Sequence, residues 1–204
     1  MTGILISVIV IFVIYICIKG SSSNSTSQKG MDSSSRKGGR LSNKDEHYLM
    51  QLAKIESQLR HKDDFYGSWM DREREELIRD ADHALPNVIL GLIYLAGIHV
   101  NADPDKAKQY FLKSIKLGSP FAYKYLAVIE NGSGNSEQGS LYMEKAISLG
   151  DPEAMMMLAV YLQYEIVSEG KPPNLKRARE LYTMAAKMGH EGAKHNLKLM
   201  DAAA

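Results

Sequence analysis

The chain has 204 residues, with 25 Lys and Arg against 24 Asp and Glu, so its formal net charge is only +1. This balance argues against a nucleic-acid partner, because proteins that bind the phosphates of DNA or RNA carry an excess of basic residues. The single cysteine, Cys17, excludes a disulfide framework and a thiolate metal site. The part from about Lys44 onwards is long enough for one domain with a packed core.

The N-terminus, residues 1–19, has the composition of a transmembrane anchor. No charged residue occurs from Ile4 to Ile18, and with its flanking residues this run is just long enough for a hydrocarbon core of about 30 Å. A secretory signal is the alternative. It is disfavoured because no Lys or Arg precedes the run and no small-x-small cleavage site closes it.

Basic residues after the apolar run predict the orientation of this anchor. Only the α-amino group precedes the run, whereas the basic residues that follow it are Lys19, Lys29, Arg36, Lys37 and Arg40. The positive-inside rule then places the C-terminal domain in the cytoplasm. The domain would instead be periplasmic or secreted if the N-terminal segment acted as a signal. Residues 20–42 are rich in Ser and Gly and nearly free of large apolar side chains, which predicts a disordered linker.

Residues 43–82 are predicted to form two amphipathic helices. In the first, apolar residues recur at helical spacing on a charged background, with Ser42 or Asn43 as the N-cap. These apolar residues are Tyr48, Leu49, Leu52, Ile55 and Leu59. The second is expected over about residues 64–82, where a few apolar residues are spread among many charged ones. We interpret both helices as a cap on the domain that follows.

An internal repeat is the most specific pattern in the chain. Gly118, Gly150 and Gly189 each stand four residues before an alanine, and a leucine follows each alanine after four more residues. Small residues occur at a shared offset before these glycines, namely Ala107, Gly139 and Ala178. The pattern predicts pairs of antiparallel helices that approach closely at the small residues.

The expected helix ends fit the same frame. Asp103-Pro104, Ser119-Pro120 and Asp151-Pro152 each place a capping side chain before a proline at the first helical position. The three glycines of the repeat are then the positions at which the second helices end.

The segment from Leu90 to Gly118, LGLIYLAGIHVNADPDKAKQYFLKSIKLG, resembles the Sel1-like repeat, a relative of the tetratricopeptide repeat. The matching positions are Leu90, Gly91, Tyr94, Gly97, Val100, Asp103, Ala107, Tyr110, Phe111 and Gly118. The second unit departs from the pattern, with Glu130 in the place of the tyrosine, and the third carries an insertion over 168–173. The resemblance implies an all-α fold over 83–204, an α/α solenoid of about three helix pairs with a C-terminal capping helix.

The sequence shows no motif for catalysis or for a cofactor. The six histidines include no pair at i, i+4 with a helical carboxylate partner, and Met155, Met156 and Met157 point around a helix rather than to one place. The chain has no P-loop, no GxSxG and no GxGxxG. We therefore expect a protein that is not an enzyme, with no metal site, no cofactor and no small-molecule substrate.

The resemblance also implies where a partner would bind, because the first helix of each pair lines the concave face of such repeats. The residues of that register are Val88, Leu92, Leu95, Phe121, Lys124, Val128, Asn131, Glu153, Met156, Val160, Gln163 and His195. The helix over 87–96 is apolar on all sides, so its concave side needs a cover. That cover is either the preceding helices of the chain, a partner helix, or a cap that a partner displaces.

These observations predict a membrane-anchored, single-pass adaptor or scaffold that binds a protein or peptide, as proteins with such repeats do. The alternative, which requires the opposite topology, is a periplasmic or extracytoplasmic immunity protein or inhibitor that binds and neutralises a toxin or an enzyme.

Overall fold

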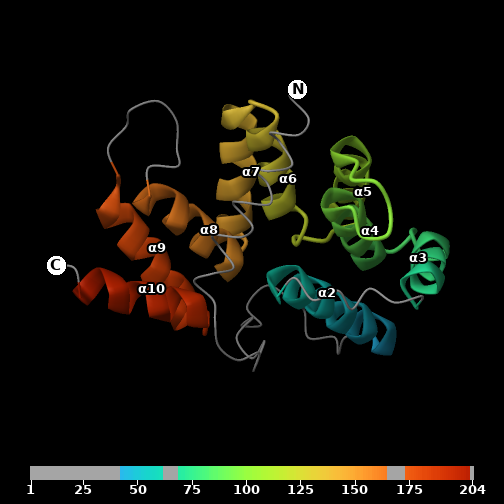
Figure 1. Cartoon of the computed structure of the whole chain (residues 1–204), viewed down its shortest axis with the longest axis horizontal. Helices are drawn as coiled ribbons and strands as arrows, with labels where there is room; N and C mark the ends of the chain where they lie inside the picture. The colour runs from blue at the N-terminus through green and yellow to red at the C-terminus, as the bar shows by residue number, and fades with distance from the viewer. Residues whose placement is uncertain (1–41, 62–68, 165–172, 203–204) are drawn as a thin grey trace. The chain divides into compact units, whose positions relative to one another are not determined.

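A computed structural model describes residues 42–61, 69–164 and 173–202 (Figure 1). Within these ranges the chain forms α-helices joined by turns, and none of the described residues lies in a β-strand, which confirms the predicted all-α class for this part. The predicted anchor (1–19) and nearly all of the predicted linker (20–42) lie outside the described residues, as does most of the insertion at 168–173. No described helix is both long and apolar enough to cross a membrane.

The described residues form two compact units, which meet in sequence between Tyr142 and Met143. The first contains α2 (Asn43–His61), α3 (Trp69–Arg79), α4 (Ala84–Ala96), α5 (Pro104–Lys116), α6 (Tyr123–Gly132) and the start of α7 (Ser136–Ser148). In it α4 and α5 pack as a pair, α2 and α3 pack on α4, and α6 packs on α5. The second contains the end of α7, then α8 (Pro152–Gln163), α9 (Leu175–Lys187) and α10 (Glu191–Ala202). Here α8 pairs with α9, and α10 packs on α9.

The helix ends follow the predicted punctuation. Asp103 Oδ1 accepts a hydrogen bond from the Lys106 N–H at 2.9 Å, and Asp151 Oδ1 accepts from Glu153 and Ala154 at 2.9 and 3.1 Å. These bonds satisfy N–H groups that have no partner inside the first turn of a helix. The three glycines that follow α5, α7 and α9 have φ of 92°, 80° and 91°, a conformation that L side chains rarely adopt.

The start of α6 corrects one prediction. Ser119 and Pro120 do not begin a helix, because α6 starts only at Tyr123 and its N-cap, Ala122, provides no side-chain bond. The Ser119 hydroxyl accepts from the Phe121 N–H at 3.4 Å, only two residues further on. A single hydroxyl therefore closes a local turn here, whereas the carboxylate of Asp151 accepts from two N–H groups and starts a helix.

Glycine allows close approach of the helices in the first unit. A Cβ at Gly91 of α4 would overlap the ring of Phe111 on α5, with the ring Cζ only 2.7 Å away. A Cβ at Gly139 of α7 would overlap the Asn131 amide of α6 and lie 3.1 Å from the Ala127 carbonyl oxygen. Both glycines thus sit where a neighbouring helix occupies the space of a side chain. The predicted role of Gly139 as a small contact residue is confirmed.

The second repeat differs from the first by an ion pair whose carboxylate is buried. In the first repeat, Tyr94 of α4 stacks on Tyr110 of α5, with ring centroids 5.6 Å apart. In the second repeat, Glu130 of α6 is buried and its Oε1 lies 2.6 Å from Lys108 Nζ of α5. The Asn135 amide donates to Glu130 Oε2 at 3.0 Å. The bond to Lys108 first, and that to Asn135, hold the pKa of Glu130 below its usual value despite its burial.

The Gly91 contact yields a stability prediction. Replacing Gly91 with Ala adds a methyl group against the fully buried Phe111 ring, and overpacking of this kind costs about 1–3 kcal/mol. This cost should outweigh the better helix propensity of Ala, which is worth about 1 kcal/mol. We therefore expect G91A to lower the free energy of unfolding, measured by urea denaturation.

A matched double variant checks the cause of that loss. In the presence of F111L, whose side chain is smaller, the effect of G91A should shrink, because the overlapping ring is gone. A G91A protein as stable as the parent would show that the Phe111 ring does not limit the α4–α5 spacing.

Candidate partner-binding surface

Helix α2 covers one side of α4 with an apolar stripe. Tyr48, Leu52 and Ile55 lie at i, i+4 and i+7, which places them on one face of the helix. Their exposed fractions are 5, 5 and 3 %, whereas Met50, on the opposite side, is 65 % exposed. The helix begins at the predicted cap, where the Ser42 hydroxyl accepts from the Asp45 N–H at 3.1 Å. Thus the described side chains of α2 are those of an amphipathic helix, with the apolar stripe of Tyr48, Leu52 and Ile55 buried.

The partner-binding residues predicted on α4 are not exposed. Val88, Leu92 and Leu95 are buried, as are most other residues of the helix, in agreement with its apolar character on all sides. One side of α4 packs on α5, and α2 and α3 of the same chain also pack on α4. A partner that binds through these three side chains must therefore take the place of a helix that already lies there.

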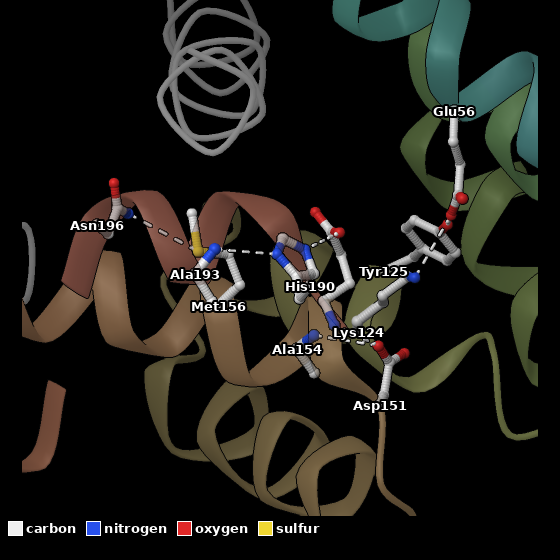
Figure 2. A network of polar contacts seen from close by, with 10 residues as sticks. Glu56, Lys124, Tyr125, Asp151, Ala154, Met156, His190, Ala193 and Asn196 are labelled. Carbon is white, nitrogen blue, oxygen red and sulfur yellow. Dashed lines mark hydrogen bonds and ion pairs between the residues drawn. The ribbon is translucent and has the colours of Figure 1, made fainter. Parts of the chain in front are cut away.

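Polar contacts fix the two ends of α2. Near its start, Lys44 Nζ lies 3.0 Å from Asp80 Oδ1, and the Tyr48 hydroxyl donates to the other oxygen of Asp80, which follows α3. Near its end, Glu56 Oε1 lies 3.4 Å from Lys124 Nζ of α6 and accepts from the Tyr125 hydroxyl. Figure 2 shows Glu56 reaching from α2 to these two residues. The helix thus contacts α4 along its apolar face and α6 through one carboxylate.

The pKa values of two carboxyl groups next to α2 are shifted in opposite directions. The hydrogen bonds from Tyr48 and Lys44 hold the pKa of Asp80 below its usual value, and the nearby His83 acts in the same direction. Burial, followed by the bond to Asp80, raises the pKa of Tyr48. Burial also raises the pKa of Glu73 on α3, whose Oε2 accepts from Gln51 of α2 at 2.8 Å. Docking of α2 therefore favours the charged form of Asp80 and disfavours that of Glu73.

The predicted residues on and next to α6 are only partly accessible. Lys124 and Val128 are buried, while Phe121 and Asn131 are half-buried. The Lys124 ammonium also lies 5.1 Å from the centre of the Tyr125 ring, which stacks on Phe111 of α5 at a centroid distance of 5.1 Å. Lys124 therefore contacts α2, the same helix that packs on α4.

In the second unit the predicted residues hold helices together. His190 Nδ1 accepts from the Ala193 N–H at 3.2 Å at the start of α10, so the proton lies on Nε2, which is 2.9 Å from Glu153 Oε2 of α8 (Figure 2). The Asn196 amide donates to the Met156 sulfur at 3.8 Å, and the Tyr182 hydroxyl donates to Gln163 Oε1 at 2.7 Å.

Of the remaining predicted residues, Val160 is buried and His195 on α10 is exposed. The structure therefore places Glu153, Met156 and Gln163 of α8 in contact with residues of α9, of α10 or of the turn between them, and Lys124 of α6 in contact with α2, while His195 is the exposed position of the set. Their role in partner binding stays a prediction.

Residues that the sequence reasoning did not assign to this surface include Glu56, Tyr125 and Asp80. The position of Glu56 in the sequence could have indicated its role, because it directly follows Ile55, a residue of the apolar stripe of α2. Its partners on α6 are far away in sequence, and the repeat pattern does not extend to α2. Among the described residues, no group of three or more His, Cys, Asp or Glu is arranged to hold a metal ion.

The helix pairs, their small contact residues and their glycine stops are typical of a helical repeat protein. In comparisons with known proteins, residues 88–119, which include most of α4 and all of α5, and residues 152–190, which include α8 and α9, match the Sel1 repeat. The predicted resemblance is confirmed in these two segments. Residues 120–151, which contain the degenerate second unit, lie between them. Sel1 repeats generally mediate protein–protein interaction.

Two individual proteins are similar to this chain. An uncharacterised protein of Neisseria meningitidis serogroup B is 30% identical over 112 residues, which cover 55% of this chain and 23% of that protein. The crystal structure of a Sel1 repeat protein from Oxalobacter formigenes aligns with a TM-score of 0.41 and 22% identity, covering 89% of this chain and 57% of that one. The chain thus spans about a quarter of the first relative and little more than half of the second.

The Asp80 contacts yield a pH prediction. We expect D80N to lower the Tm at neutral pH, because the amide cannot form the ion pair with Lys44. Since the pKa of Asp80 is lowered in the folded state, its contribution is complete above the ordinary Asp pKa, about 3.9, and is lost as the pH falls through the lower folded value. The Tm difference between the parent and D80N should therefore shrink on acidification.

Thermal unfolding followed by circular dichroism between neutral and strongly acidic pH measures this difference. D82N is the matched control, because Asp82 is exposed and its carboxylate lies 3.8 Å from His83 rather than at α2. A constant Tm difference across the whole pH range would contradict the assigned role of Asp80.

Proposed function

We propose that this chain is a non-catalytic adaptor that binds a protein or peptide through the first helices of its repeats, α4, α6, α8 and α10. One observation supports this proposal above the others. An amphipathic helix of the chain, α2, lies on α4 and contacts Lys124 of α6, so this surface has the chemistry that receives a helix. Binding of an amphipathic helix by a helical surface is a common mode of peptide recognition.

The composition of this surface suits binding rather than catalysis. Its α4 part presents aliphatic side chains, Val88, Leu92 and Leu95, which provide buried area and no acid, base or nucleophile. Lys124 adds one cation that pairs with a carboxylate and thereby selects the register of a bound helix. The general role of Sel1 repeats in protein–protein interaction supports the same function.

The proposal includes attachment to a membrane by residues 1–19, with the repeats in the cytoplasm. Its support is the uncharged run from Ile4 to Ile18 and the basic residues that follow it. A linker of the composition of residues 20–42 has a root-mean-square span of about 25 Å, which would keep the adaptor close to the bilayer surface.

Site-specific photo-crosslinking in the full chain tests the adaptor function. A photoreactive amino acid is introduced at Phe121, beside α6, or at His195 on α10, which are half-buried and exposed respectively. We expect each to crosslink a defined protein in cells of the source organism, because both lie in the predicted binding register. Gln109 on α5 and Gln138 on α7 are exposed positions on second helices and serve as matched controls.

The pattern of crosslinks decides the outcome. The same bands from Gln109 and Gln138 as from Phe121 and His195 would mean that the first helices are not the binding elements. No specific band from either first-helix position would contradict the adaptor function itself.

The topology is tested separately with reporters fused after Ala204. We expect a cytoplasmic reporter such as green fluorescent protein to be active and alkaline phosphatase, which needs an oxidising compartment, to be inactive. Active phosphatase would overturn the cytoplasmic assignment and favour the extracytoplasmic inhibitor. Removal of residues 1–19 should release the protein from the membrane fraction, and retention there would contradict the anchor.

A further inference from the structure

The contacts of α2 differ in kind from those that join α4 and α5. Helices α4 and α5 form a tight pair in which Gly91 lies directly against the Phe111 ring, so these two helices cannot part without exposing a fully buried core. Among the described side chains of helix α2, Tyr48, Leu52 and Ile55 are buried and apolar, and Gln51 and Glu56 make polar contacts to α3 and α6. An amphipathic helix bound as a ligand makes contacts of this kind.

Several of the polar contacts of α2 are open to water or imperfect. The Lys44 and Asp80 side chains are 51 and 30 % exposed, and such ion pairs contribute little to stability. Gln51 donates to Glu73, but its own amide oxygen is buried without a hydrogen-bond partner. A buried acceptor without a donor disfavours the docked state, because this oxygen binds water when α2 is free. The α2 contact therefore combines a buried apolar centre with polar contacts of unequal strength. The exposed pair at Asp80 is weak, whereas Glu56 meets a Lys124 side chain that is only 8 % exposed.

Resting on the function proposed above, we infer that α2 acts as an internal ligand, and that the partner is an amphipathic helix which repeats its chemistry and displaces it. The stripe of α2 defines this partner: an aromatic residue, Leu four positions later, Ile three positions after that, and an acidic residue next to it. The first three fill the space over α4, and the carboxylate takes the place of Glu56 beside Lys124 and Tyr125.

The consequence is regulation by competition. Because α2 belongs to the same chain, its docking is intramolecular, and a partner helix has to overcome its effective concentration. The apparent affinity of the partner equals its intrinsic affinity multiplied by the fraction of molecules in which α2 is undocked. Helices that match only the apolar stripe are excluded by α2, whereas helices that also provide the carboxylate compete with it.

A peptide with the sequence of α2, residues 43–61, tests the inference when it is labelled with fluorescein and titrated with the full-length protein. L52D places a charge in the buried stripe of the internal helix and leaves α4 and α6 unchanged. We expect this variant to bind the peptide at least about tenfold more tightly than the parent, since the surface is then vacant in more molecules. M50D alters the exposed side of the same helix and should bind like the parent.

A second pair of peptides tests the role of the carboxylate. On the L52D protein, a peptide with Glu56→Ala should bind about tenfold more weakly than the unaltered peptide, and this loss should shrink when the protein also carries K124A. A peptide with Met50→Ala should bind without loss. Equal binding of all three peptides would overturn the assigned partner chemistry.

Native-state hydrogen exchange on the parent protein covers the case in which L52D unfolds. The amides of α2 should exchange through an opening of lower free energy and lower urea dependence than the amides of α4 and α5. Exchange of α2 only in the same global event as α4 would overturn the inference, because α2 would then be part of the core. If α2 proves integral while Phe121 or His195 still crosslinks a partner, the adaptor function stands and only the displacement fails. If the peptide binds but no crosslinks form, the displacement of α2 stands and the adaptor function fails.

Discussion

The first unit depends on one constraint, namely that α4 is apolar on every side. Nine of its residues are buried, from Pro86 to Leu95 with few interruptions, and no face of this helix is suited to water. An isolated helix of this kind needs partners all around it. Helix α5 covers one side at the distance that Gly91 allows, and α2 and α3 pack on α4 as well. The amphipathic helices that precede the repeats are therefore explained by the composition of the first repeat.

The same constraint explains why the proposed binding surface and the cover by α2 share one location. A repeat helix that presents aliphatic side chains for recognition gains free energy from any helix that buries them, at about 25 cal/mol per Å² of apolar surface. In this structure the helix that packs on α4 is α2, and Tyr48, Leu52 and Ile55 form the buried apolar stripe of α2. The carboxylate of Glu56 adds a directional contact that the aliphatic surface alone does not provide.

Local features of the sequence predicted most of the repeat architecture. The aspartates before prolines, the glycines after the second helices and the small residue Gly139 are short-range patterns with direct physical meanings, and the structure has them where expected. The start of α6 was predicted wrongly because a Ser-Pro pair is compatible with both a cap and a tight turn. The surroundings of the site residues were less predictable. Register places Glu153 and Gln163 on a helix side, but their contacts with His190 and Tyr182 depend on how separate helices pack.

The ion pair between Lys108 and Glu130 restricts how the repeats can be rearranged. It joins the second helix of one repeat to the first helix of the next, and its Glu130 stands where the first repeat has Tyr94. A repeat copied or transplanted from elsewhere in the chain would bring an uncharged side chain opposite Lys108, or leave Glu130 buried without its cation. The two neighbouring repeats therefore have to be duplicated or engineered together, although each has the pattern of an interchangeable repeat.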